Sequence, residues 1–193
     1  MSPSAVESLV PELANYLVQI ESVESDAGGL TGGLSGQQLE WRPPSGKWSM
    51  AQNIGHLNAA GWLIVPRIEA SLRGAREKGL LGRGPFRHGA LGNFVVGLTE
   101  PPPRTKFRAP KTMIPPSEPP EQTLAEFFRL QERVRELIRE ANGVDLARAK
   151  VGSPIVEWFK LTLGQTFALI AGHERRHLWQ ARQVRDDPQF PAR

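Results

Sequence analysis

Apolar residues recur at helical spacing in four long stretches of this chain, and that periodicity limits the fold to packed helices. We expect helices over about 4–28, 49–74, 120–141 and 162–185, each apolar on one face and polar on the other. No stretch has a convincing strand pattern, and no repeat of fixed period is present. The sequence therefore predicts an all-α fold in which residues 1–193 form a single four-helix-bundle domain.

Residues that can hydrogen-bond to the unpaired backbone groups of a helix end, or that favour a turn there, predict where the helices start and end. A Ser or Thr followed three residues later by Glu or Gln has capping-box spacing, and this pattern predicts three helix starts. Glycines predict the helix ends, and Pro66 predicts a kink inside the second helix. The predicted caps are Ser4 with Glu7, Ser49 with Gln52 and Thr162 with Gln165, and the predicted ends are Gly28–Gly29, Gly74 and Asn142–Gly143.

Residues 75–116, between the second and third helices, are rich in glycine, proline and basic side chains. A short helix fits 91–98, and the prolines that follow make 104–116 an extended segment and exclude a central strand. We expect this long proline-rich segment to be an ordered cover packed over one end of the helices. Trp41 and Trp48, in the linker before the second helix, are expected to pack onto the bundle as a lid.

Composition excludes several classes of site and partner. The chain has no cysteine, which rules out disulfides, iron–sulfur clusters, thiolate zinc sites and a cysteine nucleophile. Its net charge of +4 is mild, and its basic residues form no dense stripe with aromatic neighbours, so we expect no nucleic-acid partner. No segment is apolar enough to span a membrane, and residues 1–10 do not resemble a signal peptide. We therefore predict a cytoplasmic protein with no membrane partner.

The pentad His173-Glu174-Arg175-Arg176-His177 in the fourth helix is the strongest local signal for chemistry. Its two histidines are one turn apart on one helix face, so both imidazoles can reach one metal ion. His173 falls at the edge of the apolar stripe, which leaves open a pair of partly exposed histidines at the rim of the core. The pentad is also an HExxH motif, but the sixteen residues after it contain no histidine or glutamate to complete a zincin peptidase site. A third metal ligand must therefore come from upstream.

His56 and His88 are the upstream candidates, because the chain has four histidines. His88 lies among glycines and a proline, in a segment expected to be a flexible loop. His56 lies early in the second helix, on the flank of its apolar face, where a lone histidine is usually a half-buried polar residue. Beside it, Ala59 and Ala60 are small enough to leave room for a substrate or a water molecule on a metal ion.

Two motifs in the chain resemble those of the DinB-like superfamily, which consists of bacterial metal-binding helix bundles. Residues 48–57, WSMAQNIGHL, resemble the WS-x-x-(E/Q)-x-x-x-HL start of the second helix in that family. Residues 173–180, HERRHLWQ, resemble its C-terminal H-x-x-x-H-x-x-Q helix. The resemblance extends over about residues 5–188 and implies a four-helix bundle with an inner metal site.

The resemblance implies a three-histidine site for a divalent metal ion, with water at the open positions. Zinc or nickel is expected first, and iron or manganese as alternatives, because imidazole ligands suit several metals. By position in the motifs, the implied ligands are His56, His173 and His177. Relatives include transferases that use low-molecular-weight thiols and others described as metal-dependent hydrolases, and family members are often homodimers.

A divalent ion held by neutral imidazoles lowers the pKa of a bound water or thiol towards neutrality, which makes a nucleophile. Because the chain has no cysteine, a thiol would have to be a substrate. Glu174 is the candidate catalytic base, and Asn53, Arg176 and Gln180 are candidates to support the metal ligands. We therefore predict a metal-dependent enzyme acting on a small molecule, either a low-molecular-weight-thiol-dependent transferase or a hydrolase.

Two other functions stay open. The bundle could bind metal without catalysis, as a sensor or stress-associated protein, and a fourth protein ligand would favour that role. A zincin-like peptidase is the weaker alternative, because of the literal HExxH. Trp158, Phe159 and Trp179 are large residues outside the predicted core stripes, which indicates packing against the cover segment or a homodimer interface.

Overall fold

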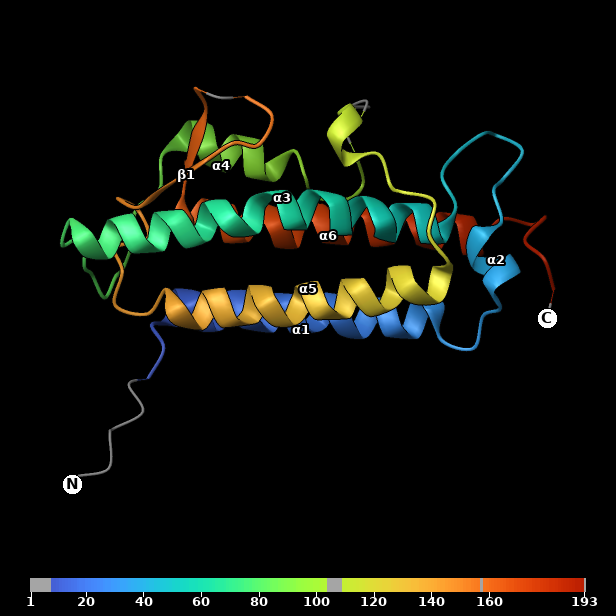
Figure 1. The fold of residues 1–193 in the computed structure, drawn as a ribbon, viewed down its shortest axis with the longest axis horizontal. Coiled ribbons are helices and arrows are strands. Elements are labelled where there is room, and N and C mark those ends of the chain that lie inside the picture. The colour runs from blue at the N-terminus through green and yellow to red at the C-terminus, as the bar shows by residue number, and fades with distance from the viewer. Residues whose placement is uncertain (1–7, 104–108, 157, 193) are drawn as a thin grey trace.

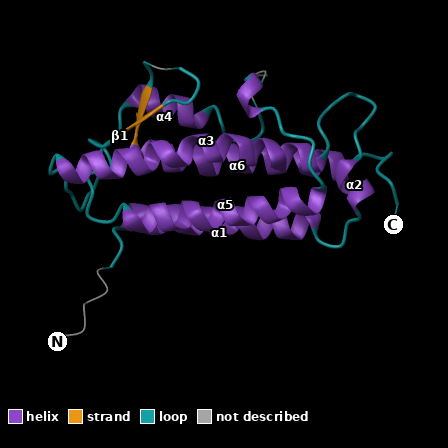
Figure 2. Cartoon of the chain, in the orientation of Figure 1, coloured by secondary structure: helices purple, strands orange, loops and turns teal. Residues whose placement is uncertain are grey.

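A computed structural model of the chain describes residues 8–103, 109–156 and 158–192. The long helices are α1 (Pro11–Thr31), α3 (Met50–Glu77), α5 (Pro120–Glu140) and α6 (Leu163–Arg185). They lie side by side (Figure 1), and both α1 and α3 pack against α5 and α6, which confirms the predicted four-helix bundle. The shorter elements (Figure 2) are α2 (Gly36–Glu40), α4 (Ala90–Gly97), the 3-10 helix η1 (Lys111–Met113) and the strands β1 (Lys150–Gly152) and β2 (Lys160–Thr162).

Two of the three predicted capping boxes are present. Ser49 Oγ accepts from the backbone N–H of Gln52 at 3.0 Å, and Gln52 Oε1 accepts from the backbone N–H of Ser49 at 3.0 Å. Thr162 and Gln165 make the same reciprocal pair, with both bonds at 3.1 Å. The predicted cap at Ser4 lies outside the described residues. The two boxes satisfy donors that a helix start leaves free, and they fix where α3 and α6 begin.

The bounds of two helices differ from the prediction. α1 begins at Pro11, a residue favoured in the first helical turn, and it continues through Gly28–Gly29. α3 continues past Gly74, so both predicted ends were wrong. In each case the extra turn carries a buried apolar side chain, Leu30 in α1 and Ala75 in α3. Burying Leu30 stabilises by about 1.5–3 kcal/mol, which is comparable to the roughly 1 kcal/mol that each of the two glycines in α1 costs.

The structure contains two short strands that the sequence did not reveal, in a fold that is otherwise helical as predicted. β1 and β2 pair antiparallel, with Val151 opposite Leu161 and both side chains buried. Each strand has only three residues, which is too short for an alternating pattern to show in the sequence. β2 leads directly into α6, and both strands pack against that helix.

Residues 75–116 contain the predicted short helix, α4, which packs along α6. The segment 104–116, expected to be extended, includes η1, which packs against α3 through the buried Met113. Residues 104–108 lie outside the described part of the chain. The continuous proline-rich cover over one end of the helices therefore stays a prediction.

In the described part of the chain, buried apolar side chains form two core clusters, and all four long helices contribute to both. On α6 the first cluster ends at Ala171 and the second begins at Leu178. The polar residues of the HExxH pentad fall between them, so the candidate site lies where the two clusters adjoin. Among the described helices, none combines the length and the apolarity needed to cross a membrane.

The ionisation of Tyr16, the chain's one tyrosine, is a probe of how α1 packs against α6. Its hydroxyl donates to Glu12 Oε1 at 2.7 Å, and its ring centroid lies 5.8 Å from that of Phe167. Burial, together with the neighbouring Glu12 carboxylate, raises the pKa of the Tyr16 hydroxyl well above 10. We expect no phenolate absorbance from the folded protein at about pH 11, although an unfolded chain titrates near 10.

The sign of the linked stability change follows from this raised pKa. A group with a higher pKa in the folded state contributes stability that is lost as the pH rises above the unfolded value, so unfolding becomes easier above about pH 10. An alkaline spectrophotometric titration, with the urea-unfolded protein as control, measures this directly. Half-ionisation of the folded protein near pH 10 would show that Tyr16 is solvated and that the packing is not as described.

Candidate metal centre

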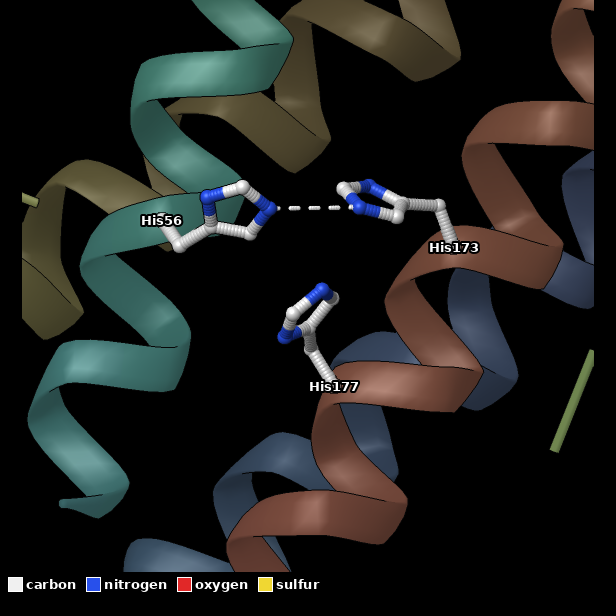
Figure 3. Close-up of side chains that lie close together, drawn as sticks. All are labelled: His56, His173 and His177. Carbon is white, nitrogen blue, oxygen red and sulfur yellow. Dashed lines mark hydrogen bonds between the residues drawn. The ribbon is translucent and has the colours of Figure 1, made fainter. Parts of the chain in front are cut away.

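Helices α3 and α6 bring three of the chain's four histidines together (Figure 3). His56 comes from α3, and His173 and His177 come from successive turns of α6. One ring nitrogen from each histidine lies within 4.8 Å of the other two, and the Nε2 atoms of His56 and His173 are 3.3 Å apart. These are the three histidines that the sequence motifs select.

Two oxygen acceptors fix how the rings are protonated. Nδ1 of His56 lies 2.7 Å from the carbonyl oxygen of Met113, which can only accept, so Nδ1–H donates and Nε2 keeps its lone pair. The amide of Asn53 donates from Nδ2 to the Ser49 carbonyl at 2.9 Å. Its Oδ1 is therefore the atom that accepts from Nδ1–H of His177, at 3.1 Å. Both rings keep Nε2 free to bind an ion, as metal-binding histidines do.

Burial keeps the three imidazoles neutral. Loss of hydration lowers the pKa of His56, His173 and His177 below the ordinary histidine value. For His173 the pKa falls to about 3, because the positive charges that His56 and Arg176 can carry add to the effect of burial. A neutral imidazole carries one lone pair, so binding near neutral pH requires at most a shift of the ring proton to the other nitrogen and no net release of protons.

The donor set fits a divalent metal ion. Two Nε2 atoms that face each other at 3.3 Å repel unless a proton or a cation lies between their lone pairs. Three imidazoles with room for further ligands are typical of catalytic zinc sites, whereas structural zinc sites are usually closed by four protein ligands. The arrangement can therefore hold a metal ion with open coordination positions.

A cavity of about 510 Å³ borders all three histidines, and we call it the histidine cavity. Trp48 forms one of its walls, with its ring centroid 5.1 Å from that of His56 and 6.1 Å from that of His177. Arg176 and Gln180 line the same cavity. The sequence named Asn53, Arg176 and Gln180 as candidates to support the metal ligands, and all three lie at the site. Asn53 makes a hydrogen bond to His177, and Arg176 and Gln180 line the cavity wall.

Glu174 lies beside the histidine cavity and does not line it. Its side chain is buried, Oε1 accepts from Gln131 Nε2 at 2.9 Å, and Oε2 has no hydrogen-bond partner among the described residues. Burial raises the pKa of this carboxyl to about 7, against the opposing effects of the Gln131 bond and of the Arg175 charge. Glu174 lines a second cavity, which shares His173 with the first.

His88, the other candidate for a third ligand, is not part of the cluster. Its Nδ1 pairs with Thr162 Oγ1 and its Nε2 with Glu12 Oε1, both at 2.8 Å. These contacts tie the segment before α4 to α1 and to the start of α6. Both ring nitrogens are occupied by protein partners, so His88 has a structural role in this fold.

Three features of the site were not predicted. His56 was expected to be half-buried on a helix flank, but it is 4% exposed because η1 and Trp48 cover that flank. Met113 contacts His56 through its backbone carbonyl oxygen, and no sequence pattern reveals a contact made by the backbone. Gln131 could have been found, because it stands in an apolar stripe four residues after Phe127, where a polar side chain indicates a buried hydrogen bond.

Comparison with known proteins places this fold and these motifs in a family. YfiT from Bacillus subtilis has a similar structure, with a TM-score of 0.59 over 95% of this chain and 91% of YfiT, at 16% sequence identity. YfiT is described as a probable metal-dependent hydrolase with an unusual four-helix bundle topology, and at this identity the likeness establishes the fold. A comparison with curated proteins gives no match. The sequence profile of the DinB superfamily matches residues 19–181, and the chain belongs to that superfamily.

Proposed function

We propose that this protein is a metal-dependent enzyme that acts on a small molecule, with His56, His173 and His177 as ligands of a divalent ion. The observation that carries the proposal is the cluster of three neutral imidazoles at the wall of one cavity. The description of YfiT as a probable metal-dependent hydrolase supports the same class of activity. Zinc or nickel suits this donor set, and iron and manganese are alternatives that metal loading would test.

The reaction that we propose is a substitution in the histidine cavity. The oxygen of water or the sulfur of a thiol forms a bond to an electrophilic atom of the substrate, the bond from that atom to the leaving group breaks, and the leaving group takes up the proton of the nucleophile. When bound, a divalent ion would supply a Lewis acid that lowers the pKa of water or a thiol towards 7. Met113 and Asn53 hold two of the rings with Nε2 free, and Trp48 limits access from one side. Arg176 places a positive charge on the same wall, which favours an anionic group in the substrate.

Hydrolysis and thiol transfer differ in the nucleophile, and the size of the cavity supports thiol transfer as a second candidate. A cavity needs a volume of roughly 10–15 Å³ to hold one water molecule. The histidine cavity has about 510 Å³, which is enough for a low-molecular-weight thiol to reach the three histidines. Because the chain has no cysteine, the sulfur would belong to that substrate.

The two alternative functions have less support. Metal binding without catalysis favours a closed site, whereas these histidines border a cavity. A zincin-like peptidase needs the glutamate of HExxH at the metal ion. Glu174 instead accepts a hydrogen bond from Gln131 and lines the second cavity, not the histidine cavity. As a catalytic base, Glu174 would act on a substrate that reaches His173 from that second cavity.

We also propose that the protein is a homodimer. Trp158 is 82% exposed and lies edge-on to Phe159, with the ring centroids 6.0 Å apart. Packing against the cover segment does not fit an indole this exposed, and a partner surface would remove it from water. Trp179 on α6 is half-buried and needs no partner.

Metal loading tests the proposed function. Chelator-treated protein is loaded with zinc or nickel and assayed with ester substrates, and separately with an electrophile together with a low-molecular-weight thiol. We expect turnover only in loaded protein, and the assay that shows turnover separates hydrolase from transferase. Stoichiometric metal without turnover in either assay would favour non-catalytic binding, and equal turnover by metal-free protein would contradict the proposal.

Removing the acceptor for His177 should weaken metal binding without removing a ligand. In Asn53→Leu the hydrogen bond to Nδ1–H of His177 is lost, so the ring is no longer held, and we expect a 10–100-fold loss of metal affinity. Asn58→Leu is the matched control, because Asn58 is also a buried amide on α3 but donates to the Thr123 carbonyl. Competition with a chromogenic chelator measures the metal affinity of both variants. Equal affinities would show that Asn53 does not support the metal site.

A further inference from the structure

The second cavity, which we call the apolar cavity, has a volume of about 480 Å³ and shares His173 with the histidine cavity. Residues from α3, α4, α6 and the β1–β2 hairpin line it. Ile155 and Val156, in the hairpin connection, are exposed and border it on the solvent side. Its buried aliphatic wall consists of Leu57, Ile64, Val151, Leu161 and Ile170.

Small residues on α3 create part of this space. Ala60, one turn after His56, presents only a methyl group to the cavity. Gly61 also lines it, but a Cβ there would lie 2.3 Å from a methyl carbon of the buried Leu130, so α5 already fills that side. Because Ala60 lines the cavity with a methyl group, we expect a larger side chain at this position to take up space in it.

Most polar side chains on the wall are already satisfied. The hydroxyls of Thr99 and Thr166 donate to backbone carbonyls at 2.6 and 2.9 Å, and Ser153 Oγ accepts two backbone N–H bonds at 3.1 Å. Among the described residues, the remaining polar side chains that line the cavity are His173 and Glu174. Oε2 of Glu174 is buried and has no hydrogen-bond partner among the described residues, and such an acceptor destabilises the protein until a donor reaches it.

We propose that the apolar cavity binds the apolar body of the substrate, an aliphatic or aromatic group that carries a hydrogen-bond donor for Glu174. This inference rests on the proposed function, because the shared wall at His173 is what brings such a substrate to the metal site. The cavity has about three times the ~150 Å³ that is sufficient for an apolar cavity to bind benzene. A ligand body gains affinity by removing these walls from water.

Straight-chain alcohols are suitable probes, because they combine an apolar chain with one donor. We expect calorimetric titration of the chelator-treated full-length chain with butanol to octanol to show affinity rising about fourfold per methylene. Ala60→Leu should weaken binding at least tenfold. Ala59→Leu, the matched control, adds the same side chain beside a different cavity and should change affinity less than twofold. Equal effects of the two substitutions, or no dependence on chain length, would overturn the inference.

The donor is tested by an isosteric pair of ligands. Hexanol and pentyl methyl ether have the same number of heavy atoms, but only the alcohol donates. We expect the alcohol to bind about tenfold more tightly to the wild-type chain, and Glu174→Leu to bring the ratio close to one. An alcohol preference that persists in Glu174→Leu would contradict the assigned role of Glu174.

A second cavity-filling variant protects the test against misfolding. Val156→Phe adds volume from the β1–β2 connection, outside the four long helices, at a residue that lines the apolar cavity but not the histidine cavity, and it should weaken alcohol binding as Ala60→Leu does. Because metal-free protein is used, absence of alcohol binding overturns this inference and leaves the proposed metal site untouched. Absence of metal binding in the loading experiment overturns the proposed function, and the alcohols would still bind.

Discussion

The His56→Ala variant is expected to bind a divalent metal ion at least about 100-fold more weakly than the wild-type chain and to lose metal-dependent turnover. Four-ligand zinc sites in small domains bind with about 10–16 kcal/mol, so each ligand contributes roughly 3 kcal/mol, or a factor of about 100 or more. His56 is the one histidine that α3 supplies, so its loss leaves two ligands on α6 alone. Equilibrium dialysis with elemental analysis measures the affinity.

His88→Ala is the matched control for that prediction. It removes the histidine that lies outside the cluster, where Thr162 and Glu12 occupy both ring nitrogens. We expect His88→Ala to keep the wild-type metal affinity while losing stability, because the buried Thr162 and the half-buried Glu12 each lose a hydrogen bond. If His88→Ala lost the metal and His56→Ala kept it, the assignment of the site would be wrong.

Truncating Phe127 should have the largest effect on stability. Phe127 is fully buried on α5 and belongs to the core cluster that also contains Ile54 and Leu178, from the two helices that carry the histidines. We expect Phe127→Ala to lower the free energy of unfolding by about 3–5 kcal/mol, because it removes buried apolar area and leaves a cavity. A domain has only about 5–15 kcal/mol in total, so the variant would be close to unfolding.

Urea unfolding of metal-free protein measures this loss, with Phe94→Ala as the control. Phe94 is 64% exposed on α4, so its truncation should change the free energy of unfolding by less than about 0.5 kcal/mol. Similar costs for the two variants would mean that the second core cluster is not packed as described.

The sequence was sufficient to predict the bundle because its local signals agree with one another. Ser49 and Thr162 start α3 and α6 through capping boxes, and the apolar stripes behind them are the faces that the bundle buries. Local signals failed where tertiary burial outweighed them. Gly28–Gly29 stays helical because the next turn buries Leu30, and β1 and β2 are too short to show a period.

The candidate site could be predicted only in part from the sequence, because it also depends on tertiary packing. His173 and His177 share a helix face, so their proximity follows from helix geometry alone. The approach of His56 to this pair depends on how α3 packs against α6, which spacing along the chain does not determine. The oxygen acceptor from Met113 depends on the path of a loop and had no sequence signal. The separation of Glu174 from the histidine cavity likewise required the structure.

Anomalous diffraction from crystals of metal-loaded protein tests the metal site most directly. Data collected on both sides of the absorption edge of the loaded metal locate that element without reference to any assumed ligand. We predict one peak about 2.0–2.2 Å from one nitrogen each of His56, His173 and His177, facing the histidine cavity and without a fourth protein ligand. A peak at another position, or none between these three rings in stoichiometrically loaded protein, would contradict the proposed metal centre.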